Sequence, residues 1–250
     1  MTLDSVPLEP APPSDRFVAL EQVFNFRDLG GLTTTSGRTV RRGLVFRSDQ
    51  FGNACPADID HLVDTVALRT VVDLRSAEEI KETGSFPSDR GVRVAHVPLR
   101  HLPWERFDQW FEEHESAAGF LTQRYTAMLE TGADEVRQVL ELMCEETPLA
   151  FHCMAGKDRT GIVAAVALGL LGVDRDDITT DFALTLYGMT RFRAWCEAND
   201  RGLARWGLRP EAEAMSGLLD NLDASFGSFE GYARAIGFTD VDALRARLLA

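Results

Sequence analysis

The chain has 250 residues, a formal net charge of −13 at pH 7 and 45% hydrophobic residues. This length and composition are typical of an ordinary globular protein with one or two domains. The acidic balance excludes nucleic acid and anionic membranes as default partners, because both bind a broadly basic face. It leaves room for a local basic site inside an acidic shell.

The N-terminal stretch and the cysteines bear on where in the cell the protein is located. Residues 1–20 begin with a proline-rich, acidic stretch without the basic and apolar regions of a signal peptide, and we expect a flexible arm there. The four cysteines form neither a CxxC pair nor a Cys/His ligand spacing, so we expect no disulfide and no metal site. The longest apolar run, 162–171, is too short to cross a bilayer. We therefore expect a cytoplasmic protein without stable membrane insertion, although export without a recognisable signal stays open.

Strands with one short helix are predicted for the first hundred residues. The β-branched apolar run at 68–76 is typical of a buried central strand. The elements predicted here are two short strands within 24–47 joined by a turn at Ser36-Gly37, the second of them RTVRRGLVFRS (38–48), a helix over 56–67 with Pro56 at its start, and strands at 68–76 and 93–99.

The rest of the chain is mainly helical by pattern. The periodicity is helical from 103 to 146, and one helix there carries an apolar stripe made of Val136, Val139, Leu140 and Met143. LAFH (149–152) predicts a strand, and a helix is expected directly after it at 160–171. From 174 onward we expect helices, with breaks near Gly188, Gly202, Pro210, Gly227 and Gly237.

Strands interleaved with helices indicate an α/β fold with a mostly parallel central sheet and helices on both faces. No linker divides the sequence, so we expect residues 21–250 to form one domain. The helical segments 102–131 and 187–226 are expected to lie over the functional site as caps. Four aromatic residues recur at helical spacing in the first segment, and we favour a packed cap over a substrate-stacking surface for Trp104, Phe107, Trp110 and Phe111.

The stretch FHCMAGKDRTG (151–161) concentrates a thiol and cationic groups at the start of a helix. The free N–H groups of a helix start carry the positive end of its dipole and bind anions. Arg159 adds a planar fork that matches two phosphate oxygens, Lys157 adds a point charge, and Gly156 lets the backbone curl. Cys153 lies in the same field and should exist as a thiolate, placed to attack phosphorus. A buried structural cysteine beside surface ion pairs is the alternative, and the combined pattern disfavours it.

HCMAGKDRTG resembles the signature loop HCxxGxxR[ST]G of the protein tyrosine phosphatase superfamily. It is more narrowly similar to the HCxAGKDRTG loop of bacterial tyrosine and lipid phosphatases of dual or triple specificity. The resemblance covers most of the chain, because that branch also carries segments that stand here as NFRDLGG (25–31), GLVFRSD (43–49), VDLRS (72–76) and FGSFEGYARAIGF (226–238). It implies a cysteine-phosphatase fold with helical cap segments.

The resemblance also implies roles for the loop residues. Cys153 corresponds to the nucleophile that forms a phosphocysteine, and Arg159 to the residue that binds the phosphoryl group in the transition state. Thr160 corresponds to a hydrogen-bond donor to the sulfur. No metal and no cofactor is implied, because arginine and main-chain dipoles neutralise the phosphate. The main-chain cradle is expected to comprise Met154, Ala155, Gly156, Lys157 and Asp158.

Two aspartates compete for the general acid that protonates the leaving oxygen. Asp73, at the end of the VDLRS strand, would act from a separate loop, as in many tyrosine phosphatases. Asp158, inside the loop, resembles the arrangement in the myotubularin lipid phosphatases. Each has a structural alternative, as an ion-pair partner or a brace. We favour Asp158, because its backbone position is fixed within reach of a bound phosphoryl group.

For the other charged residues of the motifs, both a structural and a functional role remain open. His152 either orients the loop through hydrogen bonds or tunes the thiol, and it is a poor candidate for a general base. Four residues either brace the sheet edge through salt bridges or add positive field at the cleft mouth: Arg27, Asp28, Arg47 and Arg75.

The resulting expectation is a cysteine-dependent phosphomonoesterase. Its substrates would carry phosphotyrosine, and also phosphoserine, phosphothreonine or a phosphoinositide, with Lys157 supporting this breadth as in lipid-directed relatives. A non-catalytic phosphate-binding module is the rival, but such proteins usually lose the cysteine, the arginine or the acid, and all three are present. An arsenate reductase or a sulfurtransferase fits Thr160 and the outer segments less well. The sequence leaves the natural substrate and the oligomeric state open.

Overall fold

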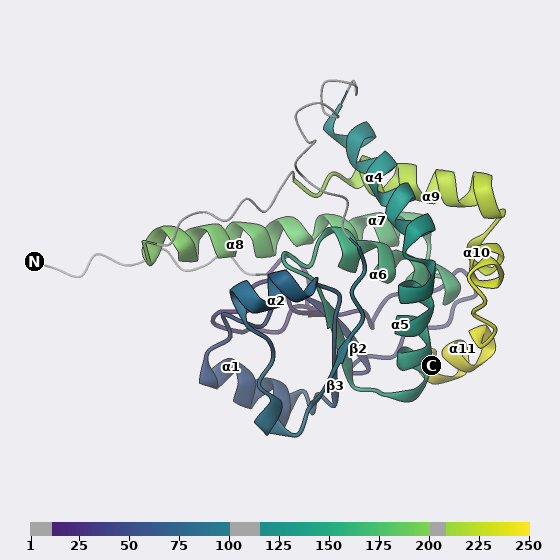
Figure 1. Cartoon of the computed structure of the whole chain (residues 1–250). Helices are drawn as coiled ribbons and strands as arrows, with labels where there is room; N and C mark the ends of the chain where they lie inside the picture. The colour runs from purple at the N-terminus through teal and green to yellow at the C-terminus, as the bar shows by residue number, and fades with distance from the viewer. Residues whose placement is uncertain (1–11, 101–115, 201–208) are drawn as a thin grey trace, which may run out of the picture.

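The computed structural model describes residues 12–100, 116–200 and 209–250. A five-stranded sheet forms its centre, in the order β1-β2-β5-β3-β4 (Figure 1). β1 pairs with β2 in antiparallel fashion, and the other pairings are parallel. The strands are β1 (Arg27–Asp28), β2 (Val45–Ser48), β3 (Thr70–Asp73), β4 (Arg93–His96) and β5 (Leu149–His152). The predicted α/β class with a mostly parallel sheet is confirmed.

Helices cover the sheet and build the second half of the chain. The first half contributes α1 (Pro56–Asp60), its continuation η1 (His61–Thr65), α2 (Ala77–Thr83) and η2 (Ser88–Arg90). The second half contributes α4 (Ala117–Thr131), α5 (Ala133–Glu145), α6 (Asp158–Leu170), α7 (Arg175–Ala183), α8 (Thr185–Ala198), α9 (Ala212–Phe226), α10 (Phe229–Ala235) and α11 (Val241–Leu248).

Two hydrophobic clusters lie on opposite faces of the sheet, because successive strand residues point to opposite sides. In β3, Val72 packs into the larger cluster with α4, α5, α6 and α9, whereas Val71 packs into the smaller one with α1 and η1. The helices on both faces therefore match the expectation, and α4 and α9 lie side by side at one end (Figure 1). The stripe predicted in α5 is fully buried.

α6 is the most deeply buried helix that the structure describes. From Arg159 to Leu170 every residue is buried, and apolar side chains cover it on all sides, as expected for a helix in the middle of a core. It begins at Asp158 rather than at the predicted position 160, so Asp158 and Arg159 belong to its first turn. The helix that follows the loop is thus rigidly held by the core.

Two predictions about local structure are wrong. The strand predicted over 38–48 contains only β2, because the chain turns at Gly43, where φ is +75°. Gly188 does not break a helix but lies inside α8, where a Cβ atom would stand 2.7 Å from Cβ of Asn25. The glycine allows α8 to cross the segment at residues 24 and 25 closely, and it costs the helix only about 1 kcal/mol.

Parts of other predictions fall outside the described residues. These are residues 1–11 of the predicted arm, the four aromatic residues of the first cap segment, and Gly202. The described end of the arm includes Arg16 and Leu20, which are buried against the domain. Breaks do occur at Gly227 and Gly237, and α9 begins just after Pro210.

Candidate active site

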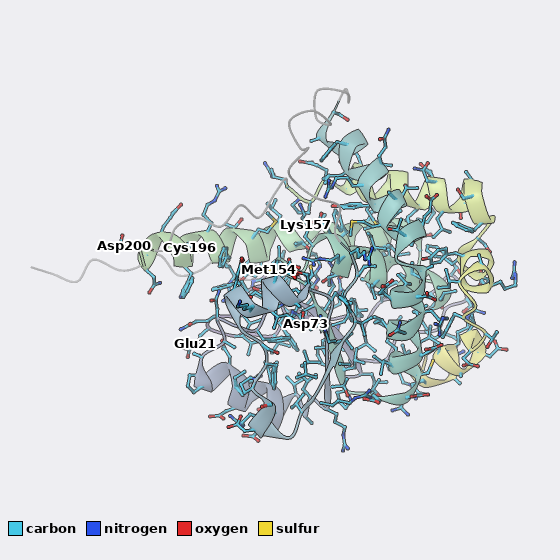
Figure 2. The ribbon with its side chains drawn as sticks, in the orientation of Figure 1. Glu21, Asp73, Met154, Lys157, Cys196 and Asp200 are labelled. Carbon is cyan, nitrogen blue, oxygen red and sulfur yellow. The ribbon has the colours of Figure 1, made fainter. Side chains whose placement is uncertain are left out.

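The carboxyl ends of the parallel strands bring the motif residues together. Ser48, His152 and Asp73 lie side by side in register on β2, β5 and β3. The residues that follow them in sequence therefore leave the sheet at the same edge, where ligands of open α/β sheets bind. In Figure 2, Met154 and Lys157 of the loop lie near Asp73 in the middle of the molecule.

The loop 153–157 is buried and closely packed between β5 and α6. Cys153 is 3% exposed and Lys157 is fully buried. Gly156 has a φ of +65°, and a Cβ atom there would lie 2.4 Å from the Ser48 carbonyl oxygen. Glycine is therefore required at this position both by its backbone conformation and by the close approach of β2.

Arg159 points back over the loop and is held by a carboxylate. Its Nη1 and Nη2 atoms donate hydrogen bonds of 2.6 Å each to the two oxygens of Glu79 in α2. Burial lowers the pKa of Arg159, but the hydrogen bonds to Glu79 and the charges of Cys153, Glu79 and Asp158 together outweigh it, so the net direction is upward. The Nε atom of Arg159 is buried without a hydrogen-bond partner among the described residues. That edge of the guanidinium group is thus available to an oxyanion.

His152 and Thr160 flank the thiol. The Nδ1 atom of His152 lies 3.1 Å from the Cys153 carbonyl oxygen, which can only accept, so Nδ1 carries the proton. Burial lowers the pKa of His152 to about 4 and keeps the ring neutral at pH 7. The Thr160 hydroxyl is buried and makes no hydrogen bond within the described part of the chain. An unsatisfied hydroxyl in this position is costly, and a sulfur anion or a phosphoryl oxygen could satisfy it.

Asp158 contacts the first cap segment. Its Oδ1 atom accepts a hydrogen bond of 2.6 Å from the Tyr125 hydroxyl in α4 and lies 3.4 Å from Nζ of Lys157. Burial and the Asp158 carboxylate raise the pKa of Tyr125 well above its ordinary value, so the hydroxyl remains a donor. The described part of the segment 102–131 thus reaches the loop through α4, as a cap would.

Asp73 is engaged in an ion pair with its neighbour. Its two oxygens accept hydrogen bonds of 2.8 and 2.6 Å from Nε and Nη2 of Arg75, and Oδ1 also accepts from the Arg75 main-chain N–H. Burial raises the pKa of Asp73, but the hydrogen bonds from Arg75 and the charges of His152 and Arg75 together outweigh it, so the net direction is downward. Asp73 is therefore an ionised, fully bonded carboxylate, which is the structural role weighed for it and for Arg75.

A second buried ion cluster lies behind the loop. Three arginines meet Asp181 of α7: Arg16 and Arg27 at Oδ1, with distances of 2.8 and 3.2 Å, and Arg47 at Oδ2, with a distance of 2.5 Å. Burial raises the pKa of Asp181, but the charges of the three arginines and the hydrogen bond from Arg16 together outweigh it, so the pKa lies well below its ordinary value. The cluster carries a net positive charge behind the loop, and Arg27 and Arg47 are buried in its salt bridges rather than placed at a cleft mouth. Asp28 braces instead, because it accepts from the N–H groups of Gly30 and Gly43.

Comparison with known proteins identifies the family. A model described as "Tyrosine phosphatase family" matches residues 18–250. The chain belongs to this tyrosine phosphatase family. It is 32% identical over 93% of its length, and 88% of the relative, to a Cupriavidus necator protein named as a candidate tyrosine-protein phosphatase. It is 26% identical to the triple specificity protein phosphatase PtpB of Mycobacterium tuberculosis, with 91% of this chain and 96% of that protein covered. The protein is thus a phosphatase of the protein-tyrosine-phosphatase type.

A solved structure adds only a weak likeness. The core catalytic domain of the PP-IP phosphatase SIW14 from S. cerevisiae aligns with a TM-score of 0.39 and 13% identity, over 73% of this chain and 96% of that one. The family assignment rests on the sequence matches and does not need it.

Several site residues of this tyrosine phosphatase escape inspection of the sequence. Glu79 had a local signal, because Ser76 and Glu79 form a capping box at the start of α2, directly after the VDLRS strand. Asp181 and Tyr125 had none, since their partners lie far away in the chain. Asn25 stands in the NFRDLGG motif, but only the structure shows its amide contacting the Ala155 carbonyl.

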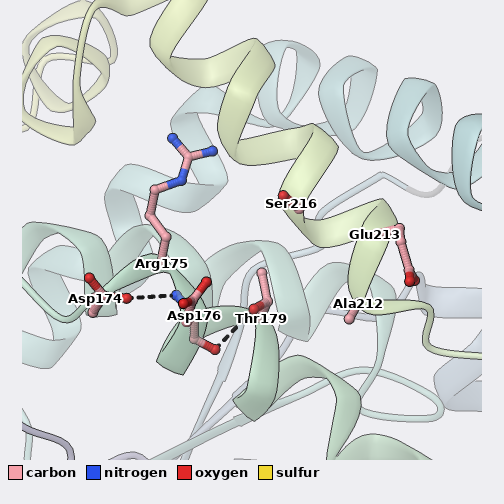
Figure 3. A pocket seen from close by; sticks show the side chains of 7 residues that line it. All are labelled: Asp174, Arg175, Asp176, Thr179, Ala212, Glu213 and Ser216. Atoms are coloured by element: carbon pink, nitrogen blue, oxygen red, sulfur yellow. Dashed lines mark hydrogen bonds between the residues drawn. The ribbon is translucent and has the colours of Figure 1, made fainter.

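A surface depression of about 460 Å³ lies away from the phosphatase loop (Figure 3). Its lining comes from α7, α9 and their flanking residues: Asp174, Arg175, Asp176, Thr179, Ala212, Glu213 and Ser216. The Asp174 side chain caps α7 by accepting from the Asp176 N–H, and the Thr179 hydroxyl donates to the Asp176 carbonyl oxygen. These polar groups complete a helix start, and the depression contains no residue of the loop.

The described residues include neither a metal-binding cluster nor a membrane-spanning helix. No group of three or more His, Cys, Asp or Glu residues there is arranged to hold a metal ion. No helix in the same part of the chain is long and apolar enough to span a membrane.

Proposed function

We propose that this phosphatase hydrolyses phosphomonoesters through a phosphocysteine formed on Cys153. The observation that carries the proposal is the position of Cys153, between the end of the buried strand β5 and the first turn of α6, which contains Arg159. The helix start and the arginine attract a phosphoryl group. The thiol, the aspartate, the arginine and the threonine stand together in the loop and the first turn of α6.

The proposed reaction has two steps. The Cys153 sulfur attacks phosphorus while the bond from phosphorus to the ester oxygen breaks, and the proton of Asp158 moves to the leaving oxygen. A water molecule then attacks the phosphocysteine, its proton returns to Asp158, and the sulfur leaves as a thiolate. The Nε edge of Arg159 and the loop N–H groups bind the equatorial oxygens during both displacements. A hydrogen bond from Thr160 would stabilise the departing sulfur.

The ion pair between Asp73 and Arg75 supports Asp158 as the general acid. The Asp73 carboxylate accepts several hydrogen bonds from Arg75, and its lowered pKa opposes carrying a proton. Asp158 instead accepts from Tyr125, a neutral group on the cap helix. The Tyr125 hydroxyl and the Lys157 ammonium group, 3.4 Å away, orient the Asp158 carboxyl group at the loop, from where we propose that it protonates the leaving oxygen.

Phosphotyrosine is the first substrate expected, with phosphoserine, phosphothreonine and phosphoinositides as further ones. The name of the Mycobacterium tuberculosis relative, a triple specificity phosphatase, supports a broad range. Lys157 at the centre of the loop supports it as well, as in lipid-directed members of the superfamily. We further propose a single domain over residues 21–250 and a cytoplasmic location, which suits four cysteines that are all free thiols.

A hydrolysis panel tests the proposal. Phosphotyrosine, phosphoserine and phosphothreonine peptides and phosphoinositides are incubated with the wild-type protein and with Cys153→Ser. We expect release of phosphate from at least one class by the wild type only. A non-catalytic binding module, the alternative, would bind these ligands with both proteins and hydrolyse none of them.

A further inference from the structure

The outer side of the phosphate loop is held by hydrogen bonds to three consecutive main-chain carbonyls. The Met154 oxygen accepts from the Gln50 N–H at 3.0 Å. The Ala155 oxygen accepts from Nδ2 of Asn25 at 3.0 Å. The Gly156 oxygen accepts from Nη2 of Arg47 at 2.8 Å, and Nδ2 of Asn25 lies 3.3 Å from it.

These bonds determine where the loop N–H groups point. A peptide unit is planar and trans, so the carbonyl of one residue and the N–H of the next point in opposite directions. When the carbonyls of residues 154–156 are fixed outward, the N–H groups of residues 155–157 face inward. The inward side is the side of the Cys153 thiol and the Arg159 guanidinium, where an oxyanion would bind.

The orientation of the Asn25 amide is itself determined by its neighbours. Its Oδ1 atom accepts a short hydrogen bond from Nη1 of Arg27, which can only donate. Its Nδ2 atom faces two carbonyl oxygens, which can only accept. Rotation of the amide by half a turn would place Nδ2 against the Arg27 donor and Oδ1 against the two carbonyl oxygens, and neither contact could be a hydrogen bond. Arg27 and Arg47 are in turn anchored by the Asp181 carboxylate.

The main chain of this segment is anchored as well. The N–H groups of Phe24 and Asn25 donate to the Asp49 carboxylate, at 3.1 and 2.9 Å. Gly188 brings α8 against Asn25 on its other side. Asn25 is completely buried, so the contact with the loop is shielded from water.

We propose that Asn25 and Arg47 are positioning residues, which keep the loop N–H groups directed at the phosphoryl group, with Asp181 aligning both through the arginines. The inference rests on the proposed function, because the oxyanion is its ligand. Neither residue touches the substrate. They act through the geometry of the main chain, and the NFRDLGG and FRSD motifs form a scaffold behind the catalytic loop.

Two conservative variants separate positioning from stability. Asn25→Asp keeps the acceptor for Arg27 and removes the donor to the carbonyls. Arg47→Lys keeps a positive charge beside Asp181 but loses the fork that reaches Gly156. Asp181 itself is a poor target, because its loss would leave three buried arginines without a counter-ion. The matched control is Tyr232→Phe, which removes another buried hydrogen bond from a side chain to a carbonyl, that of Leu129.

The experiment measures four quantities for each protein: the melting temperature, the affinity for inorganic phosphate by calorimetry, and kcat and KM for para-nitrophenyl phosphate. We expect Asn25→Asp and Arg47→Lys to bind phosphate about tenfold more weakly. Their kcat should fall on the order of 10²-fold. The control variant should show a comparable decrease in melting temperature, but its phosphate affinity and kcat should equal those of the wild type.

The outcomes distinguish this inference from the proposed function. If Asn25→Asp and Arg47→Lys keep the phosphate affinity and kcat of the wild type, the inference is wrong while the phosphatase activity stands. If their phosphate affinity falls but no protein hydrolyses a phosphomonoester, the positioning role stands and the proposed function fails. A wild-type protein that binds no phosphate contradicts both.

Discussion

Both oxygens of the Glu79 carboxylate bind the guanidinium group of Arg159, each at 2.6 Å. The pair connects the start of α2 to the first turn of α6, and it fixes the orientation of the arginine above Cys153. Glu79 also closes the capping box of its own helix, since Oε2 accepts from the Ser76 N–H. One carboxylate therefore holds a helix start and the phosphate-binding arginine together.

Glu79→Gln is expected to lower kcat about tenfold or more, because it removes a charge-assisted pair of the kind that contributes about 1.5–3 kcal/mol. Glutamine preserves the capping box, so α2 should stay intact. Steady-state kinetics and circular dichroism measure the two effects. The control is Glu78→Gln, an exposed neighbour in the same helix turn. Equal kcat values for the two variants would contradict a role of Glu79 in orienting Arg159.

Arg159→Lys is expected to reduce kcat severely, on the order of 3 kcal/mol of transition-state stabilisation. Lysine retains the charge but not the planar fork, so phosphate binding should suffer less than turnover. The comparison of kcat with the phosphate affinity measures this difference. A variant with nearly normal kcat would make the arginine a structural residue.

The general acid is tested by pH–rate profiles with a poor leaving group, phenyl phosphate, and an activated one, para-nitrophenyl phosphate. Asp158→Asn should erase the basic limb and most of the rate with the first substrate, and it should cleave the second nearly normally. Asp73→Asn breaks the ion pair with Arg75 and should affect the two substrates alike. If Asp73→Asn gives the selective pattern and Asp158→Asn does not, the assignment is reversed.

His152 makes stability depend on pH. Burial lowers its folded-state pKa from 6.5 to about 4, so between these values the unfolded chain binds a proton that the folded protein does not. Stability should therefore fall as the pH decreases through this window, by up to about 1.4 kcal/mol per pH unit. Asp73, Arg75 and Arg159 are the charged groups that act on the ring.

The measurement is the free energy of unfolding in urea, compared between the wild type and His152→Asn. Asparagine can replace the Nδ1–H donor and does not titrate. Asp49 acts in the opposite direction, because burial raises its pKa to about 6 and stability then increases as the pH falls through that value. The comparison cancels this contribution, which both proteins share. Parallel pH profiles for the two proteins would contradict the neutral, buried state of His152.

The loop and the sheet could be predicted because their signals are local. The strand β5, the loop and α6 are contiguous, and β3 is a continuous β-branched run, so periodicity and composition specify them. The residues of the main-chain cradle are contiguous in sequence, so they could be named as well. Asp158 and Asp73 could be named as candidates for the general acid from the sequence, with Asp158 favoured, but the Arg75 ion pair and the Tyr125 hydroxyl that bear on this choice could not.

The supporting residues could not be predicted because their partners are distant in sequence. Asp181 is 165 residues from Arg16, and Glu79 is 80 residues from Arg159. The tertiary fold also overrides a local preference at Gly188, where close packing on Asn25 keeps the glycine inside a helix.

The central claim, a covalent phosphocysteine on Cys153, is tested most directly by trapping the intermediate. The protein is mixed with excess para-nitrophenyl phosphate, quenched in acid within the first turnover, digested and examined by mass spectrometry. We expect one phosphorylated peptide that contains Cys153 in the wild type and none in Cys153→Ser. Turnover by Cys153→Ser, or a phosphorylated residue other than Cys153 in the wild type, would contradict the account.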